Sequence, residues 1–116
     1  MLSKEILRKK EDFDRLYNKG RSAGDRYVVV FTIPNGRDFN RIAFLASKKV
    51  GMSVARNRAR RLMKESYRRI GEKIPNGLDI VFIARNTING KKQDDVQKSM
   101  ERAIEKATNK IRERKE

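Results

Sequence analysis

Residues Ser53 to Arg69 have the sequence SVARNRARRLMKESYRR, and this stretch does most to decide the fold. On a helix, which turns by about 100° per residue, its small and apolar side chains gather on one face, together with that of Ile70. The residues of this face are Ala55, Ala59, Leu62, Met63, Ser66 and Ile70. The pattern predicts a helix from about Ser53 to Ile70 whose apolar face packs against the core.

The opposite face of this predicted helix is crowded with positive charge. Its residues are Arg56, Asn57, Arg60, Arg61, Lys64 and Arg68, and Arg58 and Arg69 flank the apolar face from the other edge. Like charges four residues apart destabilise an isolated helix by roughly 0.2–0.5 kcal/mol per pair. A merely solvated basic face would be interleaved with acids, but here Glu65 is alone. Because guanidinium groups match phosphate oxygens and stack on bases, the pattern predicts contact with a polyanion.

The whole chain shows the same imbalance of charge. Its 116 residues include 30 Lys plus Arg against 15 Asp plus Glu, a formal net charge of +15. Charge of one sign on a small body opposes compaction, and a polyanion relieves it by releasing counterions. Nucleic acid is therefore the first partner to consider, with a membrane-surface or DNA-architectural role as the alternative. The longest apolar stretch, Tyr27 to Ile33, is far too short to span a bilayer, so no membrane partner is expected.

The segments around the arginine-rich helix predict a small mixed sheet. Strands are expected at Tyr27–Ile33, Arg41–Lys48 and Leu78–Ala84, and further helices at Lys10–Lys19 and Gln93–Arg112. The first two strands are expected to form an antiparallel hairpin, and the third, largely apolar strand is expected to be central. The helix between the second and third strands is long enough to be a crossover joining parallel strands. The prediction is an α+β fold of αββαβα order, with residues 1–116 as a single RNA-binding domain.

Lys48, Lys49 and Gly51 come where the second predicted strand ends and the arginine-rich helix begins. Backbone N–H groups at a helix start, with cations nearby, can hold a phosphate. Lysines at strand ends are common without any ligand, so this signal has weight only beside the arginine residues. With them, it predicts that the two lysines extend the binding surface.

Three aromatic residues allow two interpretations. Phe13 and Tyr17 lie one turn apart on the first predicted helix, and Phe31 lies on the first predicted strand. The rings can belong to the core, or they can line a groove in which unpaired bases stack, at about 1–3 kcal/mol per base. The sequence does not show which rings face solvent, so both interpretations stay open.

The chain lacks the residues that independent nucleases commonly use. It contains no histidine and no cysteine, and its carboxylates show no metal-binding spacing. We therefore expect no catalytic residue and no metal site in this chain, so that in any RNA cleavage the reactive groups and metal ions belong to a partner. The absence of cysteine is compatible with a reducing compartment, and the cytoplasm is the expected location.

Three segments together form a specific signature. They are Ser47-Lys48-Lys49-Val50-Gly51, Val54-Ala55-Arg56-Asn57-Arg58 and Arg60-Arg61-Leu62-Met63-Lys64-Glu65. This signature resembles that of the bacterial ribonuclease P protein component, and weaker matches, such as Leu7-Arg8-Lys9 with Asp12-Phe13, extend the likeness over most of the chain. The resemblance implies a subunit that binds a catalytic RNA, ribonuclease P RNA, and helps it remove 5′ leaders from precursor tRNA, with Mg²⁺ held mainly by the RNA.

The resemblance also implies roles for individual residues. With Arg68 added from its spacing, the predicted RNA-binding residues are Lys48, Lys49, Arg56, Asn57, Arg58, Arg60, Arg61, Lys64 and Arg68. A cleft between the first helix and the sheet would receive the leader, with Phe13, Tyr17 and Phe31 at its aromatic positions. The family's crossover is left-handed, and no protein oligomer is required. The alternative is a ribosomal or other structural RNA-binding protein, which would need no aromatic cleft.

Overall fold

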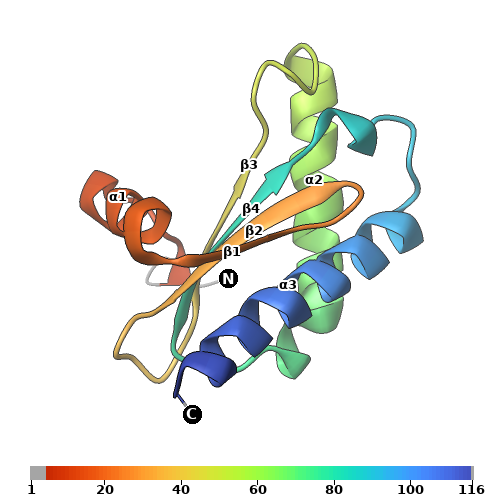
Figure 1. The fold of residues 1–116 in the computed structure, drawn as a ribbon. Coiled ribbons are helices and arrows are strands. Elements are labelled where there is room, and N and C mark those ends of the chain that lie inside the picture. Colours follow the sequence, from red (N-terminus) through yellow and green to blue (C-terminus); the bar gives the residue numbers. More distant parts are fainter. Residues whose placement is uncertain (1–4, 116) are drawn as a thin grey trace.

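A strand that is apolar on both faces lies at the centre of the fold. The computed structural model describes the backbone of residues 5–115 and the side chains of residues 5–109. The main elements are α1 (Lys10–Lys19), β1 (Arg21–Gly24), β2 (Val28–Pro34), β3 (Arg41–Leu45), α2 (Ser53–Ile70), β4 (Leu78–Ala84) and α3 (Gln93–Lys115). The strands form one sheet in the order β1-β2-β4-β3, with α1 on one face and α2 and α3 on the other (Figure 1).

Strand β4 holds the two layers together. Ile80 and Phe82 face α2 and α3, whereas Val81 faces α1, and all three side chains are fully buried. Burying a large apolar side chain stabilises a fold by about 1.5–3 kcal/mol, so a strand of this composition is most stable with covered faces and a neighbour on each side. The prediction that Leu78–Ala84 is central is confirmed.

The predicted hairpin of β2 and β3 is wrong, because β4 lies between them. β2 pairs antiparallel with β4, and β3 pairs parallel with it on the other side. The connection of residues 35–40 is long enough to step over one strand, a distance of about 10 Å. Two of its side chains bind the start of β4: Asn35 donates to Asp79 at 3.1 Å, and Asn40 accepts from the N–H of Leu78 at 2.8 Å.

Strand β1 is absent from the sequence-based prediction. Its sequence, RSAG, has no β-branched or aromatic residue, and Ala23 is its one buried side chain. It forms because it pairs with β2 from Arg21 opposite Thr32 to Gly24 opposite Val29. With this strand added, the predicted α+β class, the mixed sheet and the order of the other elements are confirmed.

The apolar face of α2 packs as predicted. Ala59, Met63, Ser66 and Ile70 are buried, and the parallel pairing of β3 with β4 makes α2 the crossover helix. The inward side chains of α3 belong to the same core; they are Val96, Met100, Ala103, Ile104 and Ala107. Ile111, which the helical spacing of apolar residues in the sequence predicts on the same face, lies outside the described side chains. No helix among the described residues is both long and apolar enough to span a bilayer.

A buried carboxylate fastens α1 to the sheet. Asp79 is fully buried and accepts two hydrogen bonds from Arg41, at 2.8 and 2.7 Å, and one from Arg15 of α1 at 3.2 Å. Arg41 also pairs with Asp12 of α1 at 3.3 Å. Burial alone would raise the pKa of the Asp79 carboxyl, but the hydrogen bonds from Arg41 and Asn35 outweigh it and hold that pKa below its ordinary value.

We predict that Asp79→Asn lowers the free energy of unfolding by about 3 kcal/mol at pH 7, because it leaves Arg41 with a poorly compensated charge. Since the pKa of Asp79 is lower in the folded chain, its contribution is complete above pH ~4 and is lost as the pH falls through the folded-state pKa. The measurement is urea unfolding at neutral and acid pH.

The matched control is Asp14→Asn, which removes an exposed pair with Lys10 at 3.4 Å. Such surface pairs contribute at most about 1 kcal/mol. Similar losses in the Asp79 and Asp14 variants would show that the buried network does not hold α1.

Candidate RNA interface

One face of α2 carries a row of cations, of which Arg61, Lys64 and Arg68 are exposed and Arg56 and Arg60 are half-buried. This arginine face consists of Arg56, Asn57, Arg60, Arg61, Lys64 and Arg68. Among the described residues, no carboxylate lies within ion-pair distance of Arg56, Arg60, Arg61 or Lys64. Arg60 instead donates to the side-chain oxygen of Asn57, and Arg56 donates to Ser53 at 3.4 Å. The predicted row of cations is thus assembled on one surface and is largely unneutralised.

Three other arginines of this helix have partners within the protein: Arg68 and Arg69 pair with Glu65, and Arg58 binds Lys91. Arg68 hydrogen bonds to Glu65, and this bond holds the pKa of the Glu65 carboxyl below its ordinary value. The pair is exposed, so it contributes little to stability and Arg68 can exchange its partner for a phosphate. Arg58 points elsewhere: it donates to the carbonyl of Lys91 at 2.7 Å and so fastens α2 to the segment before α3. Of the predicted RNA-binding residues, Arg58 therefore has a structural contact already.

The entry to α2 is a tight turn that exposes both predicted lysines. The N–H of Gly51 donates to the carbonyl of Lys48 at 3.1 Å, and Lys48 and Lys49 point to solvent. Gly51 has φ +146°, and a Cβ there would lie 2.9 Å from that of Ala55, so only glycine fits without strain. Lys48 and Lys49 consequently lie at the beginning of α2.

Two exposed apolar residues at this turn are missing from the sequence-based site. Met52 is 85% exposed and Val54 is 80% exposed, although both precede the arginine face directly. The sequence could have identified both residues, because they are apolar and yet neither falls on the apolar face of the predicted helix. Apolar side chains that remain in solvent beside a cationic surface suit contact with sugars or base edges of a bound nucleic acid.

The three predicted aromatic residues do come together. Tyr17 of α1 lies 5.0 Å from Phe31 of β2, ring centre to ring centre and edge to face, and 6.2 Å from Phe13. Tyr17 is 40% exposed, and the other two rings are half-buried. Partial burial raises the pKa of the Tyr17 phenol, so the group is neutral at physiological pH. The rings therefore pack on the sheet and also present surface to solvent. Each of the two interpretations left open by the sequence is consistent with part of this arrangement.

The sheet beside these rings is incompletely covered. Val29, Ala43 and Ile83 are only half-buried, and Leu45 is 36% exposed. The three rings and these four side chains form a partly exposed surface, which we call the aromatic groove after the role proposed for it below. Figure 1 shows α1 lying across one end of this face of the sheet, while α2 lies on the opposite face. The sequence did not identify the four aliphatic residues because their exposure depends on how far α1 reaches across the sheet.

A comparison with known protein families decides the identity of this fold. A family model described as Ribonuclease P matches residues 1–108. The chain belongs to the ribonuclease P protein family. The resemblance inferred from the signature segments is thereby confirmed, and with it the function of a subunit of the endoribonuclease ribonuclease P in the 5′ processing of tRNA. Membership of this family implies ribonuclease P RNA as the partner.

Individual relatives cover most of the chain. A "Ribonuclease P protein component" from Alkaliphilus oremlandii is 49% identical over 81 residues, which are 70% of this chain and 71% of the relative. One from Alkaliphilus metalliredigens is 42% identical over 106 residues, 91% of this chain and 96% of the relative. The alignments extend over 81 and 106 residues, so the family assignment does not depend on a short motif.

Solved structures of this family have the same fold. A Staphylococcus aureus RNase P protein mutant with defective mRNA degradation activity matches with a TM-score of 0.82 and 32% identity, covering 90% of this chain and 89% of its own. The RNase P protein from Thermotoga maritima matches with a TM-score of 0.79 and 29% identity, covering 88% and 96%. The arrangement of sheet and helices is therefore that of ribonuclease P proteins.

We predict that Arg60→Ala with Arg61→Ala weakens binding to ribonuclease P RNA and flattens its salt dependence. If each side chain neutralises one phosphate, the slope of log K against log salt concentration falls by about 1.4–1.8 in magnitude. Filter binding between 50 and 500 mM KCl would measure it. The control pair, Lys92→Ala with Lys98→Ala around the start of α3, removes the same charge and should leave the slope near that of the wild type. Equal slopes in both pairs would contradict the assignment of the arginine face.

Proposed function

We propose that this chain presents the arginine face to the catalytic RNA and the aromatic groove to the single-stranded 5′ leader of precursor tRNA. The observation that carries the proposal is the row of cations on α2 that is largely unneutralised within the protein. A folded polyanion such as RNA would neutralise these charges and release its own counterions. The chain's task is to bind and orient, while the bond-breaking groups belong to the RNA. Lys48 and Lys49, at the start of α2, extend the same contact.

The aromatic groove suits a single strand better than a duplex. Tyr17, Phe13 and Phe31 offer ring faces and edges in one cluster, and unpaired bases stack on such surfaces without a requirement for sequence. A base inside a duplex has both faces covered and cannot use them. A purely structural RNA-binding protein needs no such groove, so the groove favours a subunit that also holds substrate. By holding the leader, it would favour precursor tRNA over the mature product.

Mg²⁺ enters this proposal as an ion of the RNA. Within the described residues, no three carboxylate, histidine or cysteine groups come together as a metal site. The buried carboxylate of Asp79 accepts from Arg41 and Arg15, and that of Asp25 accepts from Arg102, so neither of these two groups is free to hold the ion. RNA phosphates supply such oxygens, and we place the ions and the reaction there. We also propose a cytoplasmic location, because the proposed substrate is precursor tRNA.

Reconstitution tests the proposal. The full chain is mixed with a bacterial ribonuclease P RNA and precursor tRNA at a Mg²⁺ concentration too low for the RNA alone to cleave efficiently. We expect the chain to restore cleavage at the mature 5′ end. A chain that leaves the cleavage rate of the RNA unchanged, although both are folded, would refute the proposed function.

We predict that Tyr17→Ala selectively weakens binding of precursor tRNA to the reconstituted enzyme, by about 5- to 150-fold, the range for one lost stacked base. Affinity for mature tRNA should not change, because it has no leader. Asn18→Ala, at the neighbouring exposed position on α1, is the control and should affect neither ligand. Equal losses for precursor and mature tRNA would show that the ring only supports the fold.

A further inference from the structure

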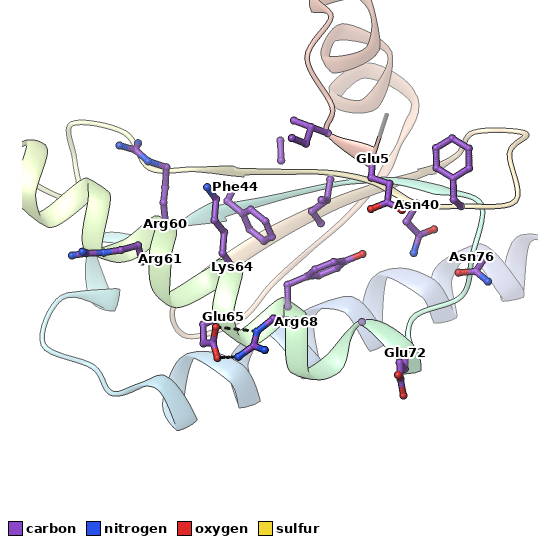
Figure 2. Close-up of a pocket in the computed structure, with 16 residues that line it drawn as sticks. Glu5, Asn40, Phe44, Arg60, Arg61, Lys64, Glu65, Arg68, Glu72 and Asn76 are labelled. Carbon is purple, nitrogen blue, oxygen red and sulfur yellow. Dashed lines mark hydrogen bonds and ion pairs between the residues drawn. The ribbon is translucent and has the colours of Figure 1, made fainter. Parts of the chain in front are cut away.

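A separate groove lies between the outer edge of β3 and the second half of α2 (Figure 2). Its volume is about 1120 Å³, which is room for a nucleotide-sized molecule. It exists because β3 is the last strand of the sheet and, among residues 5–115, only Ile6 pairs with its outer edge, opposite Ile42. We call it the edge groove, and the residues that matter to its chemistry are Asn40, Phe44, Arg60, Lys64, Tyr67 and Gly71.

One end of the edge groove is cationic. Figure 2 shows Arg60, Arg61 and Lys64 of α2 at this end, with Glu5 and Asn40 toward the other end. None of the three cations has a carboxylate partner among the described residues. Glu65, which also lines the groove, is occupied by Arg68. This end therefore offers charge-assisted hydrogen bonds to an anionic group such as a phosphate.

An aromatic wall follows next to the cations. Tyr67 and Phe44 meet edge to face with ring centres 5.7 Å apart, and both rest on Phe82 at 6.3 and 6.2 Å. Phe44 is buried, so Tyr67, which is half-buried, presents the accessible ring. Burial raises the pKa of the Tyr67 phenol, although a hydrogen bond with Asn40 opposes this, and the ring stays neutral. A neutral, well-supported ring beside a cationic end suits a flat heterocycle that is attached to a phosphate.

The edge of β3 adds hydrogen-bonding groups. The carbonyl of Ile42 faces outward and accepts from the N–H of Leu7 at 3.0 Å. Because strand residues alternate, Phe44 also directs its N–H and carbonyl outward, where no described strand pairs with it. This free edge is too short for an added peptide strand, whose affinity comes from a row of main-chain bonds. A donor and an acceptor side by side do match the edge of a nucleobase.

We propose that the edge groove binds one unpaired nucleotide of the RNA partner, with its phosphate at Arg60 and Lys64 and its base against Tyr67. This role rests on the proposed function, because it assumes that the arginine face lies on RNA. It goes further in requiring that the RNA contribute a nucleotide turned out of its stack, rather than helical backbone alone. The edge groove and the aromatic groove adjoin at Ala43 of β3, but Tyr67 and Tyr17 lie on opposite faces of the sheet, so the two grooves would hold different strands.

Filling the groove with a side chain tests this role. Gly71 has a helical φ of −56°, and a Cβ there would contact the Tyr67 ring at 3.8 and 3.9 Å, which is ordinary packing distance. Gly71→Leu should therefore cover the ring without strain and leave the melting temperature close to that of the wild type. We expect its affinity for ribonuclease P RNA to fall by about 5- to 150-fold. Asn109→Leu, which places the same leucine side chain at an exposed position of α3, should bind like the wild type.

A spectroscopic measurement on the wild-type protein gives a second readout of the same site. The chain has three tyrosines, and ¹⁹F NMR of fluorotyrosine-labelled protein reports on each of them. Saturation with ribonuclease P RNA should shift the Tyr67 signal, and Gly71→Leu should abolish the shift. Tight RNA binding with an unshifted Tyr67 signal, or with equal affinity of Gly71→Leu and wild type, would overturn the nucleotide site alone. Absence of RNA binding by the wild type would instead overturn the proposed function.

Discussion

Repulsion along the outer face of α2 is the constraint on which the rest of the structure depends. Arg56, Arg60 and Lys64 follow one another at intervals of four residues, and each such pair costs about 0.2–0.5 kcal/mol. The helix nevertheless forms because its inner face buries residues such as Met63 and Ile70, at about 1.5–3 kcal/mol each. Packing therefore outweighs the repulsion without removing it. What remains is a folded, preorganised cationic surface whose charge only a partner can neutralise.

The central position of β4 determines how this surface relates to the aromatic residues on the other side of the sheet. Because β4 is buried on both faces, one face of the sheet is left for α2 and α3 and the other for α1. The core under α1 is small, and the network around Asp79 supplements it. Since α1 covers only part of its face, Tyr17 and its neighbours stay accessible. The same packing that supports the arginine face thus leaves these aromatic and aliphatic side chains partly exposed on the opposite side of the sheet.

Local patterns predicted those parts of this structure that depend on a single segment. The repeat of apolar residues in α2 and the largely apolar β4 identified the crossover helix, its core face and the central strand. The hairpin prediction failed because the partners of β2 and β3 are chosen by distant contacts, such as that of Asn35 with Asp79. Strand β1 has no strand pattern in its own sequence and forms because it pairs with β2. The exposure of Tyr17 and the edge groove follow from strand order and coverage, which no local pattern contains.

The most direct test of the claim that the cations of α2 repel one another and bind RNA is to measure the stability and RNA affinity of Arg60→Glu. The substitution places a carboxylate four residues from both Arg56 and Lys64, so it replaces two repulsive pairs by two attractive ones. We expect the free chain to gain about 1 kcal/mol in free energy of unfolding at low salt, to lose most of that gain in 1 M NaCl, and to bind ribonuclease P RNA less tightly. A variant that is less stable than the wild type, or that keeps its full RNA affinity, would contradict this view of α2.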